Sequence, residues 1–229
     1  MPKKILVVAA HPDDEVLGCG GTIARHADEG DEVYVLIVAE GATSRQLNRN
    51  RIQASSELSN LAKSAQQAGT ILGARDVELL DLPDNRLDSL DRLDLIKTIE
   101  ERLNIYLPQV VYLHHAGDVN VDHRRLHEAV VTACRPTPGQ SVLRLLSFEV
   151  VSSTEWQTPG SAPPFRPNWF VDITEHLQRK REALLAYSSE MRPWPHSRSI
   201  EAIEHLAHWR GAQVGVDAAE AFCLLRQLQ

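Results

Sequence analysis

The sequence predicts an α/β fold in which helices cover both faces of a mostly parallel sheet. Short apolar runs of strand length alternate with longer helical patterns over much of the 229 residues. The first two runs, Ile5–Ala9 and Glu32–Ala39, are almost uninterrupted by polar residues, as expected of strands buried on both faces. No internal repeat, low-complexity segment or linker divides the chain, so we expect residues 1–229 to form one domain.

The first half of the chain contains four strand patterns, each followed by a helical pattern. This alternation is typical of a doubly wound parallel sheet. Gly73 follows the second helical pattern, where glycine favours a helix end. The expected strands are 4–9, 32–39, 76–80 and 110–113, and the expected helices are about 17–30, 51–72, 90–104 and 122–134.

The second half is less regular. Residues 158–167 are rich in proline and are expected to form a surface loop. Two prolines within residues 191–196 exclude a helix interior there. The expected strands are 143–151 and 169–173, and the expected helices are 175–187 and about 200–210.

The overall composition excludes several classes of protein. Hydrophobic residues make up 43% of the chain, which is ordinary for a globular protein. The net charge of −7 argues against a general nucleic-acid binder, which needs a basic face. No run is long enough for a membrane span, and no cleavage site follows the first apolar run, so we expect neither a membrane anchor nor a signal peptide. Three widely spaced cysteines favour a reducing compartment, and we expect a cytoplasmic protein.

The most informative segment follows the first strand, where His11, Asp13, Asp14 and Glu15 come together. Ligands of open α/β sheets bind at this carboxyl edge. His11 and Asp14 are three residues apart in a turn, so both side chains can reach one point, as metal ligands do. The alternative is that the three acids only cap the next helix, but that role does not explain His11.

A catalytic metal site needs a third protein ligand and one open position. The best candidate is His123, which follows the strand at residues 110–113 and therefore belongs to the same edge of the sheet. A set of two histidines and one aspartate suits zinc, although iron or manganese also accepts these ligands.

These two segments together resemble the PIG-L (LmbE-like) de-N-acetylases. The resemblance rests on the run Ala10–Glu15 and on the Asp-His-Arg segment around His123, and it extends over most of the chain. It implies a Rossmann-like fold, one zinc ion per chain and removal of the acetyl group from an N-acetylglucosamine-type sugar. It also implies that His11, Asp14 and His123 hold the metal, and that Asp13 is the general base.

The chain departs from the family at Asn120, where many members have a histidine that helps to stabilise the oxyanion. Asparagine can donate a hydrogen bond but no cationic proton. His115 and His196 are therefore further candidates for the oxyanion donor or general acid. His196 lies in a loop in which two prolines flank Trp194 and which also contains arginines. The alternative is that His196 is a surface loop residue without a role in catalysis.

Other polar residues follow strands at the same edge and are candidate substrate contacts. Arg45 follows the second strand and Arg86 follows the third. Asp118 follows the fourth strand, and either it or Asp122 is expected to orient His123 as a carboxylate behind the metal ligand. Each of these side chains has the alternative role of stabilising its own loop.

We therefore expect a metal-dependent hydrolase whose partner is a small N-acetylated amino sugar or its conjugate. Two other functions stay open at this point: hydrolysis of another bond such as a phosphoester, and non-enzymatic binding of a sugar nucleotide. The resemblance also makes a homo-oligomer an expectation, in which the His196 loop can reach a neighbouring cleft.

Overall fold

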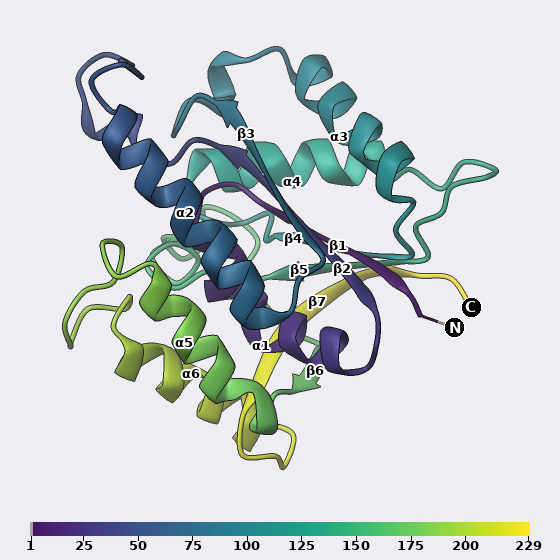
Figure 1. The fold of residues 1–229 in the computed structure, drawn as a ribbon. Helices are drawn as coiled ribbons and strands as arrows, with labels where there is room; N and C mark the ends of the chain where they lie inside the picture. Colours follow the sequence, from purple (N-terminus) through teal and green to yellow (C-terminus); the bar gives the residue numbers. More distant parts are fainter. Residues whose placement is uncertain (1) are drawn as a thin grey trace.

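The computed structural model describes residues 2–229, and its seven strands form one sheet (Figure 1). The strands are β1 (Lys4–Ala9), β2 (Glu32–Ala39), β3 (Asp76–Leu82), β4 (Val110–His114), β5 (Arg144–Phe148), β6 (Trp169–Asp172) and β7 (Ala219–Gln227). Their order in the sheet is β3-β2-β1-β4-β5-β7-β6. Strands β1 to β5 pair in parallel, whereas β7 is antiparallel to both β5 and β6.

Helices cover both faces of this sheet, as Figure 1 shows. One face carries α1 (Asp14–Asp28), α2 (Ser55–Leu72), α5 (Leu177–Ala186) and α6 (Ile200–Ala212). The other face carries α3 (Arg92–Tyr106) and α4 (Val121–Ala133). Each face has its own apolar core, because strand side chains alternate between the two faces. The predicted α/β fold with a mostly parallel sheet is therefore confirmed.

The structure differs from the sequence prediction at the chain end and at two helix starts. Strand β7 was not predicted; it extends the sheet by antiparallel pairing with β5 and β6. Helix α1 begins at Asp14 rather than near residue 17, so the acidic residues belong to its first turn. Helix α2 begins at Ser55 rather than near residue 51, because residues 51–54 form a turn.

The glycines of α1 let this helix approach the sheet closely. A Cβ atom added to Gly18 would lie inside van der Waals contact with the Phe148 ring, and one added to Gly21 would lie 2.8 Å from Ile173. The helix also bends at Cys19, whose φ of −150° is not helical. The glycines of this segment thus let helix α1 pack closely against the sheet.

The sheet has a topological switch point between β1 and β4. Strands β2 and β3 extend the sheet on one side of β1, and β4 and β5 extend it on the other. The chain connections diverge between β1 and β4, which is where open α/β sheets bind ligands. In the described part of the chain, no helix is both long and apolar enough to span a membrane.

Candidate metal and catalytic site

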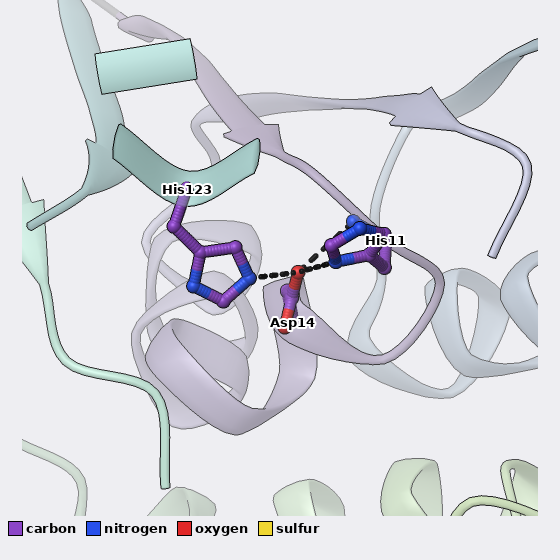
Figure 2. Close-up of side chains that lie close together, drawn as sticks. All are labelled: His11, Asp14 and His123. Atoms are coloured by element: carbon purple, nitrogen blue, oxygen red, sulfur yellow. Dashed lines mark hydrogen bonds and ion pairs between the residues drawn. The ribbon is translucent and has the colours of Figure 1, made fainter. Parts of the chain in front are cut away.

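Three predicted ligands converge at this switch point. His11 follows β1, Asp14 is the first residue of α1, and His123 lies in the first turn of α4 (Figure 2). The Oδ2 atom of Asp14 lies 3.2 Å from Nδ1 of His11 and 3.1 Å from Nε2 of His123. Figure 2 shows the two rings on opposite sides of this carboxylate.

The donor set fits a divalent metal ion. The Oδ1 atom of Asp14 is buried and has no hydrogen-bond partner among the described residues, so it is available as a ligand. Burial favours the neutral acid, but His123 and His11 outweigh it and hold the pKa of Asp14 well below its usual range. Two imidazole nitrogens and one carboxylate are the usual protein share of a catalytic zinc site, which keeps one position open.

Asp118 holds His123 from behind. Its Oδ2 lies 3.2 Å from Nδ1 of His123, which leaves Nε2 for the metal. The hydroxyls of Ser153 and Thr154 also donate to this carboxylate, and the Thr154 bond is 2.7 Å. Burial raises the pKa of Asp118, but these hydrogen bonds and His123 prevail and lower it to about 2. Asp118 is therefore an ionised acceptor that fixes the tautomer and orientation of His123.

Asp122 orients His11 in the same way. Its Oδ2 lies 3.0 Å from Nε2 of His11, and its two oxygens also accept backbone N–H bonds from Asn85 and Leu87 at 2.7 and 2.9 Å. Asp84 lies beside this pair, 3.4 Å from the same nitrogen. Because both oxygens of Asp122 already have backbone donors, we assign Asp122 to orienting His11 and not to a second metal.

Asp118→Asn is expected to lower metal affinity by about 10–100-fold, as the loss of an outer carboxylate does elsewhere. An amide is a weaker acceptor for the Nδ1–H of His123 than a carboxylate. Titration of the metal-free protein with zinc in a competing chelator measures this affinity. An unchanged affinity would contradict the role given to Asp118.

His114, the last residue of β4, lies against the predicted metal ligand His123. Its ring stacks on His123 with 3.8 Å between centroids, and its Nε2 accepts the N–H of Ala10 at 2.8 Å. Burial and the neighbouring His123 hold the pKa of His114 well below its usual value, so the ring is neutral. It supports both the turn after β1 and the ring of a metal ligand.

Asp13 lies beside the predicted metal ligands in an unusual backbone conformation. Its φ of 111° is in the left-handed region, which residues with a side chain adopt rarely. Such strained conformations are enriched at active sites. The side chain is buried and makes no capping hydrogen bond to α1, which argues against the helix-cap alternative. Its Oδ2 pairs with Nη1 of Arg198. Burial nevertheless keeps the pKa of Asp13 well above its usual value, which suits a proton acceptor.

The three candidates for the oxyanion donor have different surroundings. His196 accepts the backbone N–H of Arg198 at its Nδ1, at 3.0 Å, so its Nε2 remains for other contacts. His115 points its Nε2 at the carbonyl oxygen of Pro163, 2.9 Å away. Asn120 is the N-cap of α4, where its side-chain oxygen accepts a backbone N–H at 2.8 Å. Neither His115 nor His196 belongs to the cluster of possible ligand atoms formed by His11, Asp14 and His123.

Two predicted substrate contacts lie farther out. Arg45 is 46% exposed and pairs with Glu190 through two hydrogen bonds of 2.9 and 2.7 Å. Arg86 donates to the backbone carbonyl of Leu47 at 3.4 Å. Both arginines lie in loops at the carboxyl edge of the sheet, so their substrate role stays a prediction.

Sequence reasoning missed two residues that contact Asp13. Arg198 follows His196 by two residues, so the signal was the same unusual loop. Glu15 was considered only as a helix-capping acid. Its Oε2 accepts the N–H of Asp13 at 3.1 Å, and its Oε1 accepts the Tyr187 hydroxyl at 2.7 Å. Burial raises the pKa of Glu15 to about 7.

Comparison with known proteins identifies relatives of this chain. The family model described as GlcNAc-PI de-N-acetylase (PIG-L) matches residues 6–134. The diacetylchitobiose deacetylase of Thermococcus kodakarensis is 29% identical over 82% of this chain and 70% of its own length. The 4-oxalmesaconate hydratase of Pseudomonas putida is 28% identical over 99% of this chain and 88% of its own length. A conserved protein from Thermus thermophilus has a similar structure, with a TM-score of 0.76, 27% identity and coverage of 99% and 96% of the two chains.

The family model spans more than half of the 229 residues and includes the turn after β1 and all of α4 up to Ala133. Both segments that suggested the resemblance therefore lie within the match, and the resemblance is confirmed. The chain belongs to the PIG-L family of de-N-acetylases.

Proposed function

We propose that this protein is a metal-dependent N-deacetylase that removes the acetyl group from an N-acetylglucosamine-type sugar or its conjugate. The observation that carries this proposal is the convergence of His11, Asp14 and His123 beside a buried Asp13, in a chain of this family. The reaction adds water to the amide, breaks the C–N bond, and yields acetate and the free amine. Hydrolysis of a phosphoester and non-enzymatic sugar-nucleotide binding have no counterpart among the relatives described above.

The ligand set is proposed to hold one zinc ion per chain, which would polarise the amide carbonyl and acidify a water molecule when bound. Asp13 takes the proton of the attacking water. Its Oδ2 is paired with Arg198, so Oδ1 remains to accept this proton. Asp13 then returns the proton to the sugar nitrogen as the C–N bond breaks. Zinc identity is testable by metal analysis of protein purified without added metal.

His196 is the proposed donor to the developing oxyanion. Its Nδ1 accepts the backbone N–H of Arg198, and the Arg198 side chain pairs with Asp13, so the loop that carries His196 is tied to the proposed general base and Nε2 is left without a partner within that loop. The Nε2 atom of His115 is instead hydrogen-bonded to the carbonyl oxygen of Pro163 at 2.9 Å, and the side-chain N–H of Asn120 donates to Oδ1 of Asn85 at 3.0 Å.

His196→Asn is expected to lower kcat about 100-fold, which is typical for the loss of one oxyanion donor. Asparagine can still accept the Arg198 N–H, so the loop is expected to keep its shape. His115→Ala is the matched control and should change kcat little. A larger loss in His115→Ala than in His196→Asn would reverse the assignment.

A second candidate function is hydration of a carbon–carbon double bond. The observation in its favour is the match to 4-oxalmesaconate hydratase, which extends over 99% of this chain. The same base and the same metal ligands can activate water for either reaction.

One experiment separates the two candidates. Purified protein is incubated with N-acetylglucosamine, with diacetylchitobiose and with 4-oxalmesaconate, each with and without a zinc chelator. Chelator-sensitive release of acetate from a sugar supports the proposal. Hydration of 4-oxalmesaconate without any acetate release would overturn it in favour of the second candidate.

Two wider expectations accompany the proposal. Cys19, Cys134 and Cys223 are all free thiols, which supports the proposed cytoplasmic location. A homo-oligomer is proposed from the family resemblance, and light scattering of the purified protein measures its mass against the 25.6 kDa chain.

A further inference from the structure

Arg198 connects the loop before α6 to the proposed general base. Its Nη1 pairs with Oδ2 of Asp13, and its Nε donates to the hydroxyl of Ser152 at 2.7 Å. The Arg198 side chain is 23% exposed, whereas the Asp13 side chain is 2% exposed. The Arg198 guanidinium therefore lies between the Asp13 carboxylate and solvent, and its hydrogen bond to Ser152 holds it in place.

The side chain and the backbone of Asp13 have separate partners. The backbone N–H is held by Glu15, which in turn accepts the hydroxyl of Tyr187. Among the hydrogen bonds of the described residues, only that from Arg198 reaches the Asp13 carboxylate. Asp14 and Glu15 are neighbouring buried acids, so their charges repel this carboxylate and Arg198 opposes that repulsion.

We propose that Arg198 is a positioning residue that fixes the Asp13 carboxylate for proton transfer, acting through Asp13 and not on the substrate. This inference rests on the proposed function of Asp13 as general base. Arginine suits the role because its rigid fork reaches Asp13 and Ser152 at the same time. A lysine ammonium supplies the charge but cannot span both partners in a fixed geometry.

The expected kinetic result is a loss in kcat with little change in KM. Arg198→Gln lowers kcat about 100-fold, the effect of misplacing a catalytic group by about 1 Å. Arg198→Lys recovers part of this loss because it restores the charge but not the fork. Arg192→Gln is the matched control, since Arg192 lies in the same loop and donates to the backbone carbonyls of Ser189 and Met191. A raised KM with unchanged kcat would mean a contact with the substrate and would overturn the proposal.

A double-mutant comparison tests whether Arg198 acts through Asp13. In the Asp13→Asn background, Arg198→Gln should lower the residual rate no further, because the group that it positions is already gone. A further loss of similar size in that background would show an independent role and would contradict the proposal.

A structural measurement keeps the inference testable if the wild-type protein releases no acetate. In a crystal structure of the Arg198→Gln variant, the Asp13 carboxylate should leave its position while His11, Asp14 and His123 stay in place. An unmoved Asp13 side chain would overturn the positioning role. Absence of wild-type turnover together with a displaced Asp13 would instead count against the proposed reaction alone.

Discussion

Asp13→Asn is expected to lower kcat by about 100- to 10,000-fold, the usual contribution of a general base. The amide has nearly the same shape as the carboxylate and tolerates the left-handed backbone at this position, but it cannot accept a proton. The three proposed metal ligands are unchanged, so the metal content should remain at the wild-type level. Acetate release and metal analysis of the same preparation measure both quantities.

The control for this variant is Asp88→Asn, which changes an exposed aspartate in the turn Leu87–Ser89. It removes one carboxylate without touching the site and should retain full turnover. If Asp13→Asn also retained turnover, another group would have to be the base.

His123→Gln is expected to lower metal affinity more than 100-fold and to reduce turnover accordingly. Mutation of a carboxylate behind a metal ligand lowers metal affinity by up to roughly 100-fold. We expect a larger loss here because a direct ligand is removed. Glutamine has a similar volume, but its neutral amide is a poor zinc ligand. Metal content after gel filtration, and turnover before and after zinc is added back, measure the effect.

His208→Ala provides the comparison for this variant. His208 is exposed on α6 and hydrogen-bonds the backbone carbonyl of Asp217. The variant should keep its metal and its turnover. If the His123→Gln variant kept the wild-type metal content, His123 would not be a ligand. The proposed site would then lack its third protein ligand.

Much of the candidate site follows from local sequence. His11 and Asp14 lie three residues apart, so one tight turn brings them together whatever the rest of the fold does. The partnership with His123 follows from topology, because the carboxyl ends of parallel β1 and β4 lie side by side. Residue type then limits the chemistry to a nitrogen- and oxygen-liganded metal.

Other parts of the site were not predictable in this way. From the sequence, Asp118 and Asp122 were equally good candidates for the carboxylate that orients His123. Only the orientation of α4 shows that Asp118 pairs with His123 and Asp122 with His11. Strand β7 was missed because its identity as a strand depends on antiparallel pairing with β5 and β6. Pairing of this kind has no local sequence signature comparable to an apolar run followed by a helix.

The sequence by itself therefore determined the α/β class, and it predicted that His11, Asp14 and His123 come together at one edge of the sheet as candidate metal ligands. Each of these depends on short spacings or on the regular alternation of strands and helices. The tertiary structure alone decided that Arg198 meets Asp13 across 185 residues of chain. The physical reason is that such a contact depends on how α6 and the preceding loop pack over the sheet, and packing is a property of the whole fold.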